Sequence, residues 1–329
     1  MRISCAFPSS SEVPELGRLA EQLGYFRVWC YDSPALYGDV WVTLARLAER
    51  TTHIGLGPGV LVPSLRHPMV NAAAIATVAE LAPGRLAVAI GAGFTGRLAL
   101  GQRPVPWRDV EAYVRVLRSL LAGEDAVWDG AVVRMLHAPG MAPPRPVEVP
   151  ILVAADGPKG LAVAEAVGDG VISARPMEAA AALPWKAVMQ WGTVLDPGED
   201  FDCERVQAAA GPGAVIVYHA AYALRGAGAV RRLPGGDQWV AAVEAEPEAT
   251  RHLAIHEGHA VASNAADRQV AEESRALWSR GLTGDADEIR RRADKLDGLG
   301  VDEVVYQPTG PDVARELSAM AAALGLRGE

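Results

Sequence analysis

Eight short runs of apolar and β-branched residues alternate with longer segments of helical periodicity along this chain of 329 residues. Runs of this kind are typical of strands that are covered on both faces, as in an all-parallel sheet. Their regular alternation with helices predicts an α/β fold, a closed (β/α)8 TIM barrel, which occupies roughly 250 residues or more. The predicted strands are residues 3–7, 28–31, 54–62, 86–90, 151–154, 171–174, 215–220 and 304–307.

Two regions are longer than ordinary connections between a strand and a helix. Residues 177–213 and 225–284 each follow a predicted strand, so we expect insertions at the carboxyl-terminal face of the strands, forming substrate walls or lids. Neither region shows enough apolar periodicity for a core of its own, and we predict a single domain over residues 1–329. A smaller excursion at residues 127–135, which contains an Asp-Gly pair, favours a hairpin over a plain loop.

The composition disfavours several classes of partner. A formal charge of -9 disfavours the binding of nucleic-acid phosphates, which needs a clustered basic face. The apolar segment 69–81 falls short of the roughly 20 residues needed to span a bilayer, and no export signal is indicated. The three cysteines form no CxxC pair, which fits a reducing compartment. We expect a cytoplasmic protein without a nucleic-acid or membrane partner, and apolar barrel helices favour a homodimer.

Two glycine-rich segments lie at the ends of neighbouring predicted strands. Residues 56–63 place Gly57 and Gly59 inside a strong strand pattern, which indicates a bulge or the close approach of a ligand to the backbone. Residues 90–94 end the fourth strand but lack the third glycine of a dinucleotide-binding fingerprint. A flat ring could therefore rest against these strand ends without a Rossmann domain.

A third glycine-rich segment, residues 154–160, joins the fifth strand to a helix. Pro158 suits the first turn of that helix, and Asp156 is the predicted N-cap. The backbone amides of Lys159 and Gly160 would then point outward at the positive end of the helix dipole, where an anion can bind. A capped loop without any ligand is the alternative.

The order of these motifs resembles that of the luciferase-like monooxygenase superfamily, and within it the coenzyme F420-dependent branch that includes methylenetetrahydromethanopterin reductase. The resemblance covers most of residues 1–176 and returns at 301–308. The motifs that carry it are Trp29-Cys30-Tyr31-Asp32, Gly57-Pro58-Gly59-Val60, Arg66-His67-Pro68, Gly84-Arg85-Leu86, Gly91-Ala92-Gly93 and Ala154-Ala155-Asp156-Gly157-Pro158.

The resemblance implies an oxidoreductase that uses coenzyme F420 and transfers a hydride between the deazaflavin C5 and a small organic substrate. Two alternatives stay open because fold does not determine function. One is an FMN-dependent monooxygenase that uses molecular oxygen on the same barrel. The other is a non-catalytic protein that binds a flavin or deazaflavin.

The resemblance also implies the positions that contact the cofactor. Asp32 would lie beside the reacting ring as the catalytic candidate, and Gly59-Val60 would form a non-prolyl cis peptide against the back of the ring. One departure matters, because Ser33 stands where members of the family often have a histidine, so a proton-transfer role of that histidine does not carry over. The implied cofactor-binding residues are Asp32, Gly59, Val60, Gly91, Gly93, Phe94, Ala154, Ala155, Asp156, Gly157, Pro158 and Lys159.

Three histidines, His252, His256 and His259, are spaced four and three residues apart on a predicted helix. Three ligands from one helical stripe would crowd a tetrahedral zinc ion, and the HExxH arrangement is missing. We therefore expect no metal, but a partly exposed helix or a wall of the substrate pocket. The candidates for contact with substrate are His256, Trp191 and Arg175, which follows the sixth strand.

Two further pairs of residues have more ordinary interpretations. Arg66 and His67 precede Pro68 at the start of a helix, where a helix cap or a salt bridge is favoured over contact with substrate. Tyr218 and His219 lie in the predicted seventh strand, where only one of the two could face the barrel interior.

Overall fold

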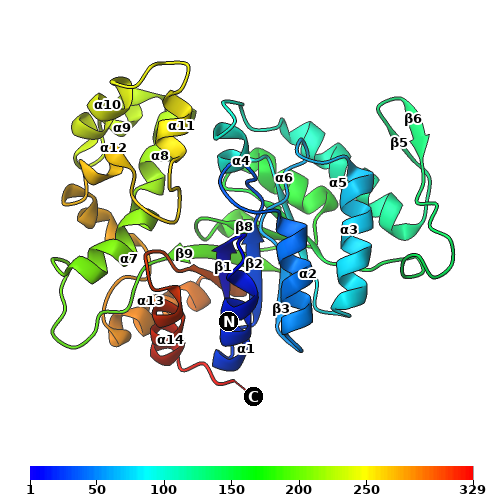
Figure 1. Cartoon of the computed structure of the whole chain (residues 1–329), viewed down its shortest axis with the longest axis horizontal. Coiled ribbons are helices and arrows are strands. Elements are labelled where there is room, and N and C mark those ends of the chain that lie inside the picture. Colours follow the sequence, from blue (N-terminus) through cyan, green and yellow to red (C-terminus); the bar gives the residue numbers. More distant parts are fainter. Residues whose placement is uncertain (329) are drawn as a thin grey trace.

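The computed structural model describes residues 1–328, with residues 279 and 280 described by their backbone alone. Eight parallel strands form one sheet in the order β3-β2-β1-β10-β9-β8-β7-β4. The sheet curls into the predicted barrel, with helices around it (Figure 1). The strands are β1 (Arg2–Pro8), β2 (Arg27–Tyr31), β3 (Gly55–Pro58), β4 (Val88–Gly91), β7 (Ile151–Ala154), β8 (Gly170–Ser173), β9 (Lys186–Trp191) and β10 (Glu303–Gln307).

The edge between β3 and β4 closes the barrel around a bulge. Parallel bridges pair Leu56 with Leu86 and Leu61 with Ile90. Between the two bridges the first segment advances by five residues and the second by four, so the first segment contains one extra residue. The extra residue lies in the glycine-containing stretch where a bulge was predicted, and the Gly59–Val60 peptide bond there is cis. A bulge bends a strand and redirects its side chains. The closing edge is thus irregular where the strand ends approach the mouth of the barrel.

The outer helices form because each has one apolar stripe that can be buried against the sheet. In α5 (Trp107–Ala122) the predicted stripe from Val110 to Leu121 is buried, and the helix ends at Gly123, whose φ of 85° suits a left-handed cap. None of the helices within the described residues combines the length and the apolar character needed to cross a bilayer. The other helices around the barrel are α1 (Val13–Leu23), α2 (Val40–Arg50), α3 (Pro68–Leu81), α6 (Pro158–Val167), α13 (Ala286–Gly298) and α14 (Val313–Leu324).

The predicted hairpin is confirmed as β5 (Ala126–Trp128) paired with β6 (Ala131–Val133). Asp129 and Gly130 both have positive φ, 49° and 79°, as a two-residue hairpin turn requires. Trp128 packs edge-on against Tyr113, with ring centroids 5.7 Å apart. This contact attaches the hairpin to α5.

The predicted seventh strand is wrong. Residue 215 separates α7 (Glu204–Ala214) from α8 (Ile216–Arg225) and residues 216–220 lie in α8, whereas the seventh strand of the barrel is β9. The β-branched residues at 215–217 favour a strand by propensity, but they pack against neighbouring helices, and tertiary packing overrides propensity. Part of the region predicted as an insertion at 177–213 therefore supplies a barrel strand.

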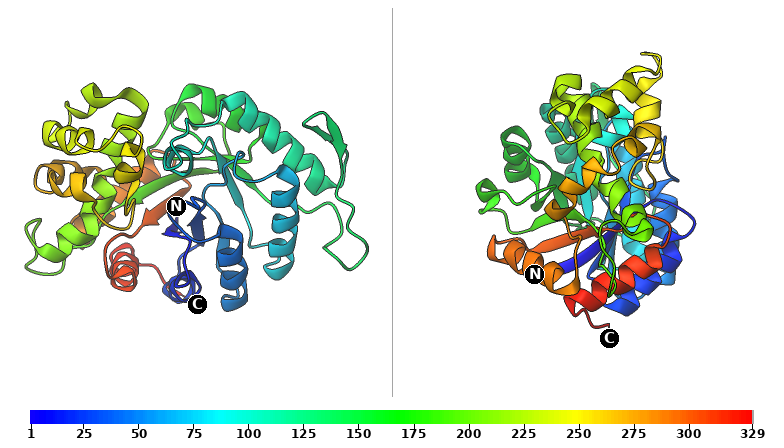
Figure 2. Two further views of the ribbon diagram at one scale, coloured as in Figure 1. Left: turned by 45° about the horizontal axis from the view of Figure 1, so that its top comes forward. Right: turned by 90° about the vertical axis from the view of Figure 1, so that its left-hand side faces the viewer.

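One insertion follows β9 and continues to α13. It forms a helical cluster beside the barrel, coloured yellow-green to orange (Figures 1 and 2). Contrary to the prediction, it has a core of its own around the buried side chains of Tyr218, Trp239 and Val243. Besides α7 and α8 it contains α9 (Ala227–Val230), α10 (Gly236–Glu244), α11 (Arg251–His256), α12 (Ala265–Arg268) and the 3-10 helix η2 (Glu273–Arg280).

Closure of the barrel depends on the missing side chain at Gly57. A Cβ built there would lie 1.8 Å from the carbonyl oxygen of Ala87, and neither backbone can yield without breaking the bridges. We predict that Gly57→Ala lowers the free energy of unfolding by about 3 kcal/mol, the upper end for overpacking a core. Urea denaturation measures this. Gly298→Ala is the matched control, because a Cβ at Gly298 meets nothing within 4 Å. Equal stability of the two variants would contradict this account of closure.

Candidate functional site

The carboxyl ends of β3, β4 and β7 bring predicted cofactor residues together. A Cβ built on Gly91 would lie 3.0 Å from Cγ2 of Val60 and 3.1 Å from Cβ of Ala154. Three residues that are distant in sequence therefore surround one point where only hydrogen is present. Val60 and Ala154 already close on the bare backbone of Gly91, and we call this point between the three strand ends the cradle. A flat ligand can approach a backbone that carries no side chain.

Below this cradle the barrel interior is filled. The Trp29 ring is fully buried there, and its Nε1 donates a 2.9 Å hydrogen bond to Oε1 of the buried Glu303. Trp185 donates to the other oxygen of Glu303 at 2.7 Å. The remaining buried side chains of this layer are Ala6, Ala87, Ala89, Leu152, Ile172, Ala187 and Val305. A ligand at the strand ends would thus rest on a solid, mostly apolar floor.

Two polar residues near the cradle were not singled out from the sequence. Tyr31 ends β2, and its hydroxyl donates a 3.0 Å hydrogen bond to Oε1 of Gln307, which ends β10. Both side chains are partly exposed. The adjacent ends of parallel strands could have indicated them, because such residues line the mouth of a barrel.

Asp32 follows β2 and is 3% exposed. Its Oδ2 accepts a 2.6 Å hydrogen bond from Nη1 of Arg66. Arg66 donates its other nitrogen to Asp39 at 2.7 Å, and Asp39 in turn caps the amino terminus of α2. Burial raises the pKa of the Asp32 carboxyl above its ordinary value, and the hydrogen bond and charge of Arg66 oppose that rise. The predicted salt bridge of Arg66 is confirmed, and it holds the catalytic candidate.

A short helix, α4 (Phe94–Leu98), lies over the end of β2. A Cβ on Gly96 would lie 3.2 Å from the backbone oxygen of Asp32 and 3.4 Å from Oγ of Ser33, so helix and strand end are in close contact. Gly93 precedes the helix with a φ of 81°, a left-handed conformation that favours glycine. The two predicted positions Gly93 and Phe94 therefore lie near Asp32, through α4.

The turn from β7 into α6 differs in one respect from its prediction. Asp156 does not cap the helix. Its Oδ1 accepts a 2.7 Å hydrogen bond from the amide of Ala174, which joins the ends of β7 and β8. Gly157 is the N-cap and has no side-chain cap, while Pro158 begins the helix as predicted. A Cβ on Gly157 would meet nothing within 4 Å, so the amide end of α6 is open to a ligand.

The three predicted substrate residues lie on separate elements. Arg175 is exposed in the loop after β8. Trp191 ends β9 and packs against α7, where a Cβ on Gly213 would lie 2.8 Å from its Cβ. His256 ends α11 inside the insertion and is 2% exposed. Arg175 is thus exposed, Trp191 is partly exposed and His256 is buried.

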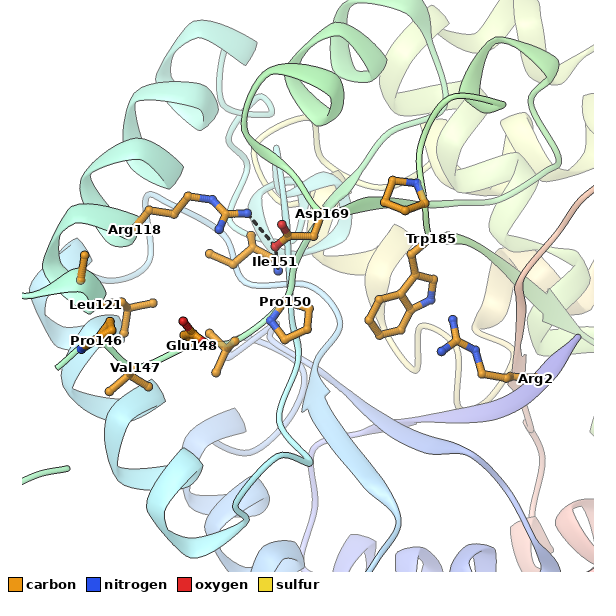
Figure 3. Close-up of a pocket in the computed structure, with 13 residues that line it drawn as sticks. Arg2, Arg118, Leu121, Pro146, Val147, Glu148, Pro150, Ile151, Asp169 and Trp185 are labelled. Carbon is orange, nitrogen blue, oxygen red and sulfur yellow. Dashed lines mark hydrogen bonds and ion pairs between the residues drawn. The ribbon is translucent and has the colours of Figure 1, made fainter. Parts of the chain in front are cut away.

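A cavity of about 810 Å³ opens at the opposite end of the barrel, where β1, β7 and β9 begin (Figure 3). Its lining includes Arg2, Trp185 and the ion pair between Arg118 and Asp169, whose atoms are 2.7 Å apart. None of the predicted cofactor residues lines it. Active sites of such barrels are built at the carboxyl ends of the strands, so this cavity is not the candidate site.

The sequence matches a known protein family and several curated proteins. Residues 5–187 match the model of the luciferase-like monooxygenase family. The chain is 33% identical over 162 residues to 5,10-methylenetetrahydromethanopterin reductase of Archaeoglobus fulgidus, covering 47% of this chain and 46% of that protein. It is 36% identical over 175 residues to the F420-dependent glucose-6-phosphate dehydrogenase of Beutenbergia cavernae, covering 47% and 49%. The chain thus spans about half the length of the curated relatives it matches.

A solved structure extends the likeness of fold to nearly the whole chain. The coenzyme F420 dependent tetrahydromethanopterin reductase from Methanopyrus kandleri superimposes with a TM-score of 0.71 at 19% identity, covering 98% of this chain and 99% of that one. At this identity the likeness concerns the fold. The family model covers more than half of the chain, including Asp32, the β3 bulge and the turn into α6. The chain therefore belongs to the luciferase-like monooxygenase family.

Proposed function

We propose that this protein is an F420-dependent oxidoreductase that transfers a hydride between the deazaflavin C5 and a small organic substrate. The observation that carries the proposal is the cradle at Gly91, between Val60 and Ala154. Curated relatives are named as F420-dependent enzymes, which favours F420 over FMN. When bound, the deazaflavin supplies the centre that accepts or donates the hydride.

The residues fit such a cofactor from ring to tail. Gly59 and Val60 would contact one face of the ring, beside the bare backbone of Gly91. Gly93 and Phe94 would line the channel beside α4. The uncapped amides at the start of α6, with Lys159 exposed next to them, would hold the anionic tail. Asp156 would act at a distance by holding this turn against the end of β8.

The chain's own contribution to the reaction is positioning and the handling of one proton. Asp32 would hydrogen-bond at the reacting edge, with Arg66 holding its carboxyl in place. Arg175 and Trp191 would form part of the substrate wall. His256 could reach substrate only if the insertion opened, because its ring is buried. The insertion would exclude water from the strand ends.

We further propose a homodimer in a reducing cytoplasm. Cys5, Cys30 and Cys203 are all free thiols, as a reducing compartment favours. Val42 on α2 and Val70 on α3 are 61% and 53% exposed, and burial against a second copy would remove this apolar surface from water.

Binding of the two cofactors separates the main alternatives. We expect F420 to bind the purified chain at least about tenfold more tightly than FMN, which corresponds to about 1.4 kcal/mol. Fluorescence titration measures both. Gly91→Val should abolish F420 binding by filling the cradle, while circular dichroism confirms that the variant is folded. Preferential FMN binding with oxygen consumption would favour the monooxygenase alternative. Cofactor binding without turnover of any offered carbonyl or alcohol would favour the non-catalytic one.

A carboxylate placed at the amino terminus of α6 should change the stability of the protein and its affinity for F420 in opposite directions. Gly157→Asp would add a side-chain cap, raising the free energy of unfolding by a few tenths of a kcal/mol, about 0.3. The same carboxylate would repel the anionic tail and weaken F420 binding by roughly tenfold. A deazaflavin riboside without the phosphate tail should bind both proteins equally, and Gly157→Ala serves as the control for size. Equal loss of affinity for F420 and riboside would place the tail elsewhere.

The pair of Asp32 and Arg66 predicts a specific pH dependence. Arg66 opposes the rise of the Asp32 pKa, so Arg66→Met should move the acidic limb of the kcat/KM profile to higher pH. The variant leaves a buried carboxylate unpaired, a loss of about 3–5 kcal/mol of stability at neutral pH that fades on acidification as Asp32 takes up a proton. Asp32→Asn should remove the limb altogether. An unchanged limb in Arg66→Met would show that another group controls it.

A further inference from the structure

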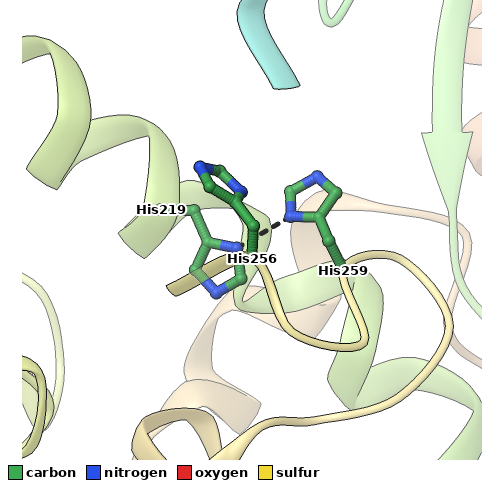
Figure 4. Close-up of side chains that lie close together, drawn as sticks. All are labelled: His219, His256 and His259. Carbon is green, nitrogen blue, oxygen red and sulfur yellow. Dashed lines mark hydrogen bonds between the residues drawn. The ribbon is translucent and has the colours of Figure 1, made fainter. Parts of the chain in front are cut away.

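Three buried histidines meet inside the insertion (Figure 4). His219 lies on α8, His256 ends α11, and His259 lies in the turn that follows; they are 1%, 2% and 5% exposed. Each can offer one ring nitrogen such that all three nitrogens lie within 4.8 Å of one another. His252, which the sequence places with them, does not belong to the group. The three ligands therefore come from two helices and a turn, and they are not crowded on one helical stripe.

A buried carboxylate orients the first histidine. Oδ1 of Asp267 lies 2.9 Å from Nε2 of His219 and also accepts a 3.0 Å hydrogen bond from Nε1 of Trp239. Asp267 is 1% exposed. With the proton of His219 held at Nε2, the lone pair of its Nδ1 faces the other two rings. A carboxylate behind a histidine is the usual outer-shell arrangement of a metal ligand.

The charge of Asp267 has no permanent cation to balance it among the described residues. Its hydrogen-bond partners there are His219, Trp239 and the backbone amide of Asn264. Buried charges in proteins are paired or coordinate metals. A divalent ion bound to Nδ1 of His219 would supply the balancing positive charge, with the imidazole ring lying between the ion and Asp267.

The other two histidines also present lone pairs to the same point. Nδ1 of His259 lies 2.9 Å from Nδ1 of His219, and its Nε2 lies 3.1 Å from the hydroxyl of Thr95, which can accept the proton of that nitrogen. Nδ1 of His256 is buried without a hydrogen-bond partner among the described residues.

We propose that His219, His256 and His259 bind one zinc ion, with Asp267 as a positioning residue behind His219. Three neutral imidazoles suit zinc, which would complete a tetrahedron with a water molecule. Zinc–nitrogen distances of about 2.0–2.1 Å require the two Nδ1 atoms to separate by only a few tenths of an ångström.

The ion would join three segments of the insertion and connect them to the barrel. His259 contacts Thr95 after β4 through its ring, and its carbonyl accepts a hydrogen bond from the hydroxyl of Tyr37, which follows β2. The predicted cofactor channel begins at the same places, the carboxyl ends of β2 and β4. Zinc would therefore hold the insertion beside that channel. This inference does not depend on the identity of the cofactor.

The test measures zinc on the full chain without any cofactor. Protein stripped with a chelator and then titrated with Zn²⁺ against a chromophoric competitor should bind one ion per chain. His256→Ala should weaken binding by more than the roughly 10–100-fold typical of losing an outer-shell partner. This variant is chosen because the His256 ring donates and accepts no hydrogen bond among the described residues, so its loss leaves no polar partner unpaired. His252→Ala, on the same helix, is the matched control and should bind as the wild type does.

Two independent readouts keep the result interpretable. Co²⁺ should give the visible absorption of a tetrahedral site in the wild type and in His252→Ala, but not in His256→Ala. Zinc should raise the melting temperature of the same two proteins only. The proposal is overturned if the wild type binds zinc no more tightly than His256→Ala, or if His252→Ala loses binding equally. In either case the three rings are packed together without binding an ion.

Discussion

The backbone of β3 passes so close to β4 that residue 57 has no room for a side chain. The barrel can close there only because Gly57 lets the carbonyl of Ala87 approach, and the strand then bulges before pairing resumes at Leu61. The bulge places Val60 opposite Gly91, where a second missing side chain leaves the cradle. Closure of the fold and the shape of the site thus come from one local constraint.

Polar contacts connect this rigid edge to the rest of the barrel mouth. Arg66, in the loop after the bulge, binds Asp32 at the end of β2 and Asp39 at the start of α2. Asp156 fastens the end of β7 to that of β8. Each of these side chains is held by a partner from another connection, which restrains the strand ends relative to one another. A site that is formed in advance loses less ordering entropy on binding.

The sequence predicted those parts of the fold whose signals are local. The stripe on α5, the hairpin turn at Asp129 and Gly130 and the bulge near Gly59 all follow from spacing or backbone conformation. It failed at residues 215–220, because β-branched residues can also pack in a helix, while β9 carries Lys186 and Gln190 and lacks the apolar pattern of its neighbours.

The errors at individual side chains have a related cause. Asp156 has the composition of an N-cap, yet its carboxylate turns to the amide of Ala174, a partner that only the sheet brings near. His219 was assigned to a strand, so its position beside His256 and His259 could not be foreseen from the spacing of histidines along one helix. In both cases the deciding partner is distant in sequence, and pattern alone does not identify such partners.

The family match and the insertion divide the chain into two parts with different constraints. The matched residues 5–187 contain the cradle, Asp32 and the turn into α6, and the match ends within β9. The insertion that follows has its own core and its own buried histidines, and it meets the barrel through Tyr37 and Thr95. Because the insertion reaches the barrel at the ends of β2 and β4, a change in its internal packing would alter the wall of the channel without disturbing the strands. If the proposed function holds, specificity for substrate can therefore change in this part of the chain while the residues proposed to hold the cofactor stay the same.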